Sequence, residues 1–131
     1  MAANGQPPRH SWTRKVGWAV RGVLWSIGAQ RGNFAIHLAT AAAVLVAGFL
    51  LQVSLVEWCL LVMCIAAVLA AELFNTALEQ LARAITREHS EEVRNALDAA
   101  AGAVLVAAKG AAIVGAIIFI SRLGMRLEWW G

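Results

Sequence analysis

Charged residues are scarce in this chain of 131 residues. Asp, Glu, Lys and Arg make up 15% of it and hydrophobic residues 60%, whereas charged residues make up about 25% of a typical soluble domain. This composition argues against a soluble protein and indicates a membrane protein. Three long apolar stretches leave little room for a soluble module, so residues 10–131 are expected to form one integral-membrane domain. Residues 1–9 are polar and are expected to be disordered.

Cysteine is rare, and the common metal and nucleotide motifs are absent. Cys59 and Cys64 stand five residues apart on different faces of one apolar stretch, so they are expected to be buried packing residues without a disulfide. The sequence has no CxxC, HExxH or closely spaced His/Cys set, which leaves a structural zinc site without support. It also lacks a Walker A sequence, a kinase-type glycine-rich loop and a Rossmann fingerprint. Any nucleotide site is therefore of another kind.

Apolar residues recur in a pattern that predicts four helices. Residues 10–27 carry apolar side chains at helical spacing and arginines on the opposite side, as expected of an amphipathic helix on a membrane surface. Three longer stretches can each cross a hydrocarbon core of about 30 Å at 1.5 Å per residue: 33–53, 56–85 and 95–120. Residues 52–55 are expected to form a tight turn and residues 86–94 a solvated loop.

Basic residues are unevenly distributed between the two sides of the expected bundle. Five precede the first span and three lie around the second loop, but the first loop has none. Lys and Arg are enriched on the cytoplasmic side of membrane proteins, so the N-terminus and the second loop are predicted to be cytoplasmic. Arg122 and Arg126 are assigned to a C-terminal tail beyond the third span.

Four polar residues share one face of the second span: Glu72, Asn75, Thr76 and Glu79. At about 100° per residue they fall within an arc of roughly 100°. Ionisable groups at membrane depth are costly and usually face a protein interior or a water-filled cavity. One interpretation is a polar seam that fixes helix register in an oligomer. The other is catalytic, because one carboxylate can accept a proton from a lipid hydroxyl while another, nearer water, holds magnesium on a nucleotide.

The segments NFAIHL, ELFNTALEQL and ALDAAAGAVLVAA resemble the small bacterial integral-membrane kinases of the diacylglycerol kinase and undecaprenol kinase family. The resemblance extends from about Trp12 to Phe119. It implies an all-α homotrimer with a surface helix and three membrane helices per subunit, in the bacterial inner membrane. It also implies composite active sites between subunits at the cytoplasmic interface, with ATP as cosubstrate and Mg²⁺ as cofactor.

The resemblance assigns roles to individual positions. Glu72 corresponds to the catalytic base and Asn75 to its polar neighbour. Glu79 corresponds to a metal-coordinating carboxylate, and Asp98 to an acidic residue of the nucleotide site.

Three positions depart from the family pattern, which has glutamate, aspartate and lysine where this chain has Arg31, Arg83 and Leu97. The two arginines are candidates for direct phosphate binding, because guanidinium groups pair well with phosphate oxygens. Two functions follow: an ATP-dependent kinase of a lipid alcohol, diacylglycerol or undecaprenol, or a catalytically weakened member that acts as a membrane scaffold or lipid-binding protein.

Lys109 and His37 are unusual because they are ionisable residues inside expected spans. Two interpretations of Lys109 are open: an ion pair with Glu72, or an inward-facing lysine that stabilises the trimer. His37 is expected to be a hydrogen-bonded structural residue, since a lone histidine in a bundle more often has that role.

Overall fold

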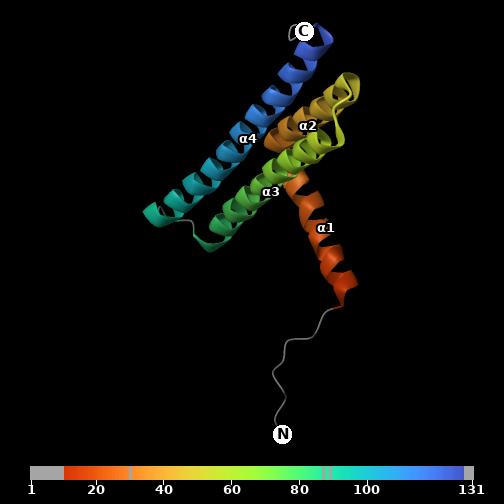
Figure 1. Ribbon diagram of the computed structural model, residues 1–131. Helices are drawn as coiled ribbons and strands as arrows, with labels where there is room; N and C mark the ends of the chain where they lie inside the picture. Colours follow the sequence, from red (N-terminus) through yellow and green to blue (C-terminus); the bar gives the residue numbers. More distant parts are fainter. Residues whose placement is uncertain (1–10, 30, 87, 89, 129–131) are drawn as a thin grey trace.

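The computed structural model describes residues 11–29, 31–86, 88 and 90–128, without the side chain of Arg31. These residues form four α-helices (Figure 1): α1 (Trp12–Ala29), α2 (Arg31–Leu51), α3 (Leu55–Ile85) and α4 (Glu91–Arg126). The expected all-α architecture is confirmed. The predicted disorder of residues 1–9 concerns a segment outside the described residues.

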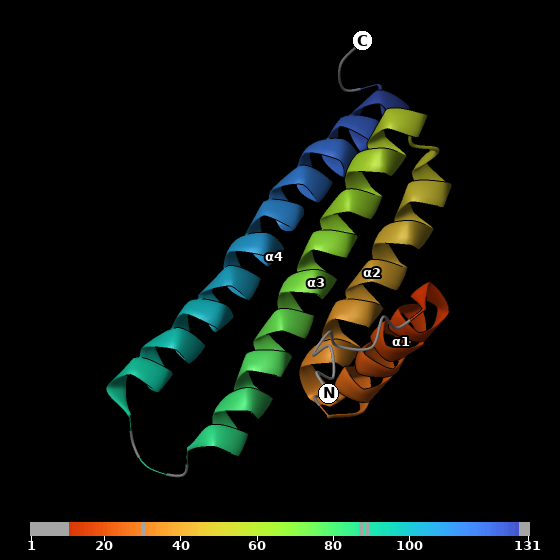
Figure 2. The same cartoon turned by 90° about the horizontal axis from the view of Figure 1, so that it is seen from below.

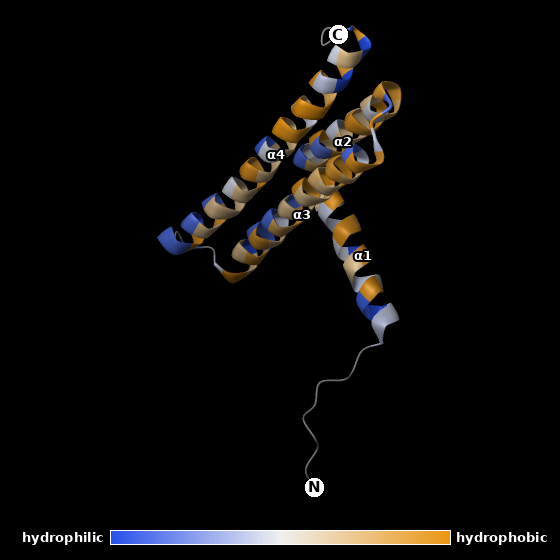
Figure 3. Ribbon diagram, viewed as in Figure 1, coloured by the Kyte–Doolittle hydropathy of each residue, from blue (hydrophilic) through white to orange (hydrophobic). Residues whose placement is uncertain are grey.

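Helices α2, α3 and α4 lie side by side as an antiparallel bundle, and α1 leaves it at an angle (Figures 1 and 2). All three bundle helices are long and apolar enough to cross a membrane. Contact between α3 and α4 is the most extensive, whereas α2 contacts each of them more sparsely. Hydrophilic residues gather at both ends of α4, and hydrophobic residues cover most of its length (Figure 3).

Helix α4 is longer at both ends than the sequence predicts. The expected loop through residue 94 was wrong, because Ser90 caps the helix and its Oγ accepts a hydrogen bond from Val93 N at 3.3 Å. Glu91 and Glu92 then occupy the first turn, where the helix dipole favours negative charge. The assignment of Arg122 to a tail was also wrong, since the helix continues to Arg126.

The turn between α2 and α3 is tight, as predicted. Gln52 has a left-handed φ of 53°, and Ser54 starts a capping box with Glu57. Glu57 N donates to Ser54 Oγ at 3.3 Å, and Ser54 N donates to a Glu57 carboxylate oxygen at 2.6 Å. Two backbone donors that a helix start leaves unpaired are thereby satisfied.

The beginning of α3 is held to the end of α4 by an ion pair. Arg122 Nε donates to Glu57 Oε2 at 2.9 Å and to Oε1 at 3.1 Å, and its Nη2 also donates to Oε2. This contact fixes how the two antiparallel helices lie against each other. No local sequence pattern predicts this ion pair, because the partners are 65 residues apart.

Close approach of α2 and α3 depends on a glycine at the same end of the bundle. A Cβ added at Gly48 would lie 2.7 Å from Trp58 Cη2, closer than carbon atoms tolerate. The Trp58 ring also packs against Phe49, with ring centroids 4.8 Å apart. A side chain at position 48 would therefore push the two helices apart.

Most apolar side chains of the three long helices lie on the outer surface of the bundle. At most 17% of the most apolar window of each helix is buried, so these surfaces require lipid or other subunits around them. Cys59 and Cys64 are free thiols, as expected. Burial was wrong for Cys59, which is exposed, whereas Cys64 is half-buried between the helices.

Candidate functional site

The polar face of α3 points into the bundle. Glu72 is 1% exposed, Asn75 5% and Thr76 0%, although nearly all of their neighbours on the helix are apolar. Because a carboxylate is buried only at a high cost in desolvation, such a group is usually paired or functional. The prediction that these residues face the protein interior is confirmed.

His37 of α2 lies next to Glu72. Its Nε2 is 3.8 Å from Glu72 Oε2, and its side chain is 21% exposed. The sequence interpretation treated His37 as an isolated structural residue, so it missed this partner. The available signal was weak: both residues are polar, but His37 lies about two turns after the start of α2 and Glu72 about four turns before the end of α3.

Three buried oxygen atoms at this site have no hydrogen-bond partner in the described part of the chain. They are Glu72 Oε1, Asn75 Oδ1 and Thr76 Oγ1. A buried polar atom left unpaired costs about 1–3 kcal/mol, and most such atoms in native proteins have a partner. Each of the three oxygens can accept a hydrogen bond, so a donor placed among them would be stabilised.

Polar contacts continue from this cluster toward the end of α3. Asn75 Nδ2 donates to Glu79 Oε1 at 3.1 Å, and Glu79 Oε2 lies 3.8 Å from Arg83 Nη2. Exposure rises along this line, from a side chain that is 27% exposed at Glu79 to one that is 68% exposed at Arg83. The line thus connects the buried amide of Asn75 with a guanidinium that solvent can reach.

Asp98 of α4 makes no hydrogen bond or ion pair with this cluster. Asp98 lies about two turns into α4 rather than at its start, its side chain is exposed, and it makes no hydrogen bond or ion pair within the described residues. The side chain of Arg31 lies outside the described part. The roles predicted for both residues stay predictions.

Lys109 forms no ion pair with Glu72 within the described residues of the single chain, and the predicted pair stays a prediction for the assembled protein. The Glu57–Arg122 contact sets α3 against α4 so that Lys109 and Glu72 lie within one turn of each other along the bundle. Their side chains nevertheless point to different places, because Lys109 is exposed on α4 and Glu72 is buried beside His37. The second interpretation, a lysine facing another subunit, stays a prediction.

The described residues thus form an all-helical protein with three candidate membrane spans and a buried carboxylate whose Oε1 has no hydrogen-bond partner among them. The family model described as prokaryotic diacylglycerol kinase matches residues 17–119. The undecaprenol kinase of Bacillus subtilis (strain 168) is 41% identical over 100 residues, which cover 76% of this chain and 81% of that protein. The chain belongs to the prokaryotic diacylglycerol kinase family, whose members are lipid kinases and hence phosphotransferases.

A second relative is consistent with this membership. The diacylglycerol kinase of Synechocystis sp. (strain ATCC 27184 / PCC 6803 / Kazusa) is 38% identical over 107 residues, which cover 81% of this chain and 59% of that protein. No solved structure matches the chain. Both relatives are named as kinases, so neither supports the alternative of a scaffold or lipid-binding protein.

Proposed function

We propose that this protein transfers the γ-phosphoryl group of ATP to the hydroxyl of a membrane lipid alcohol, diacylglycerol or undecaprenol. The observation that carries the proposal is the state of Glu72, which is buried, lies beside His37 and keeps Oε1 without a partner. A lipid hydroxyl that donates to Oε1 would complete the cluster. The names of the two relatives supply the two candidate lipids.

Glu72 acts as general base in this proposal. It accepts the proton of the lipid hydroxyl while the hydroxyl oxygen forms a bond to the γ-phosphorus, and the bond from that phosphorus to the bridging oxygen of the leaving ADP breaks. His37 Nε2, 3.8 Å from Glu72 Oε2, positions the carboxylate. Because the hydroxyl is delivered in the plane of the membrane, much of the acceleration comes from proximity.

The line from Asn75 to Arg83 faces the nucleotide. Magnesium in phosphoryl-transfer sites is held by one or two carboxylates together with substrate phosphates, and the carboxylate of Glu79 beside the amide of Asn75 fits that donor chemistry. A magnesium ion bound there would neutralise part of the negative charge of the phosphates. Arg83, and by sequence Arg31, would pair with phosphate oxygens, and Asp98 would contact the nucleotide from α4.

The distribution of charged residues also bears on the orientation of the protein in the membrane and on its oligomeric state. The excess of basic residues supports a cytoplasmic N-terminus and α3–α4 loop, on the side of the bacterial inner membrane where ATP is available. An exposed lysine within the apolar α4 supports a homotrimer, since a neighbouring subunit would shield Lys109 from hydrocarbon.

The test is phosphorylation of a lipid panel by the purified protein. With ATP and Mg²⁺, we expect radiolabelled phosphate in diacylglycerol or undecaprenol and much less in ceramide. Glu72→Gln should abolish it, whereas Glu88→Gln, which neutralises an exposed loop carboxylate, should not. Absence of product with every lipid, from protein that retains its helical circular dichroism, would refute the kinase proposal.

A further inference from the structure

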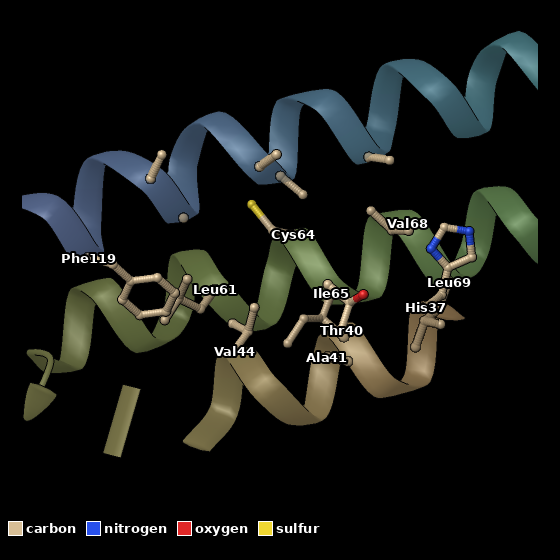
Figure 4. A pocket seen from close by; sticks show the side chains of 15 residues that line it. His37, Thr40, Ala41, Val44, Leu61, Cys64, Ile65, Val68, Leu69 and Phe119 are labelled. Atoms are coloured by element: carbon tan, nitrogen blue, oxygen red, sulfur yellow. The ribbon is translucent and has the colours of Figure 1, made fainter. Parts of the chain in front are cut away.

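An apolar groove lies between α2 and α4, with α3 as its floor (Figure 4). Its volume is about 300 Å³. Apart from Phe119 at one end, the wall on α4 consists of small residues, which leave the space open: Ala108, Ala111, Ala112, Gly115 and Ala116. Leu61, Ile65 and Val68 of α3 line the floor.

Only one end of the groove is polar. His37 lies at the end near Leu69 and Phe119 at the other end, with Thr40 between them beside Ile65 (Figure 4). Thr40 Oγ1 donates to Ile36 O at 2.8 Å, so its hydroxyl is already paired with the backbone. His37 is left as the polar link between the groove and the candidate site, since it is also the neighbour of Glu72.

The dimensions of the groove match a lipid chain better than a helix. The α4 wall from Ala108 to Phe119 is about 17 Å long, close to the half-thickness of a hydrocarbon core of about 30 Å. An α-helix of that length and about 10 Å in diameter would occupy roughly 1,300 Å³. A volume of about 300 Å³ lies in the range of small-molecule sites.

We propose that the groove holds a hydrocarbon chain of the lipid alcohol while its hydroxyl lies against Glu72. This inference rests on the proposed kinase function. A lipid whose headgroup is at the membrane surface has its chain directed toward the bilayer centre, and the groove runs in that direction from His37. Because surrounding lipid tails are as apolar as the groove, it orders the chain and positions the hydroxyl rather than adding hydrophobic affinity.

The first test fills the groove. Ala112→Phe places an aromatic ring inside it, and Ala103→Phe adds the same ring to an exposed α4 position outside it. For Ala112→Phe, we expect the ratio of kcat/KM for dioleoylglycerol to that for dibutyrylglycerol to fall roughly tenfold or more, because the long chain is displaced. Ala103→Phe should keep the wild-type ratio. A wild-type ratio in active Ala112→Phe protein would overturn the inference.

The second test does not depend on activity and uses the two natural thiols. Cys64 lines the groove and Cys59 is exposed outside it. In Cys59→Ala protein, dioleoylglycerol should slow alkylation of Cys64 by N-ethylmaleimide several-fold, and dibutyrylglycerol should not. In Cys64→Ala protein, neither lipid should change alkylation of Cys59.

The outcomes separate this inference from the kinase proposal. Protection of Cys64 by the long-chain lipid without phosphorylation of any lipid would support the groove and refute the kinase. Phosphorylation without protection would refute the groove alone. Protection that is present without lipid and is lost when the oligomer dissociates would assign the groove to a second copy of the chain and overturn the inference.

Discussion

Glu57 and Glu72 lie on the same helix, about four turns apart, and their surroundings differ sharply. Glu57 receives donors from Arg122, and it also closes a capping box with Ser54. Glu72 is more deeply buried, has His37 at 3.8 Å, and keeps Oε1 unpaired in the described part of the chain. A carboxylate whose hydrogen bonds are all made within the fold serves stability. A buried carboxylate with an oxygen that accepts no hydrogen bond from the fold can accept one from a substrate.

The largest expected effect comes from neutralising the two glutamates separately. Glu72→Gln should lower kcat by at least about 100-fold, the usual contribution of a general base, without lowering the unfolding temperature, because a buried charge is removed. Glu57→Gln should lower the unfolding temperature, because the pairing with Arg122 is lost, and should leave kcat near the wild-type value. Kinase assays and thermal melts of both variants in one detergent would measure this, and equal loss of activity in both would contradict the division of roles.

A smaller effect is expected at the exposed end of the polar line. Glu79→Gln should raise the Mg²⁺ concentration needed for half-maximal activity roughly tenfold, because a ligand charge is lost. Arg83→Gln should raise the KM for ATP with little change in the Mg²⁺ requirement, since the guanidinium contacts phosphate. Magnesium and ATP titrations of both variants would separate the roles. A Mg²⁺ requirement unaffected by Glu79→Gln would exclude this carboxylate as a ligand.

His37 is expected to act through Glu72 rather than on substrate. His37→Gln should lower kcat about tenfold through misplacement of the carboxylate and leave the KM for ATP unchanged. In the Glu72→Gln background the same change should have almost no further effect, because its partner in catalysis is gone. A full tenfold loss in both backgrounds would show that His37 contributes independently of Glu72.

The smallest effect on activity is expected at the opposite end of the bundle. Gly48→Ala should destabilise the fold by about 1–3 kcal/mol, because its Cβ meets Trp58. Activity per folded molecule should stay near wild type. Denaturation with SDS measures the stability, and Gly110→Ala, with open space around its Cβ, is the matched control. Equal stability of the two variants would contradict the close packing at Gly48.

Much of the fold follows from the sequence because hydrophobic runs define membrane helices almost by themselves. The end of α3 at Ile85 was predicted correctly, whereas the ends of α4 were not. Ser90, Glu91 and Arg122 are polar and look like loop residues, although a cap, the helix dipole and an ion pair keep them helical.

The site was predictable in part. Helical periodicity alone placed Glu72, Asn75 and Glu79 on one face of α3. The contact of His37 with Glu72 depends on how α2 and α3 lie against each other, which no local pattern encodes. Lys109 shows the same limit, because its exposure on α4, away from the buried Glu72, depends on how the helices lie against each other.

The pairing of Glu57 with Arg122 also has a consequence for biosynthesis. The arginine is synthesised 65 residues after the glutamate, which takes roughly 3–13 s at 5–20 residues per second. During that interval the rest of α3 and most of α4 are synthesised, and Glu57 has only its cap at Ser54. The hairpin of the first two spans therefore waits for the last helix to be inserted before its outer end is locked.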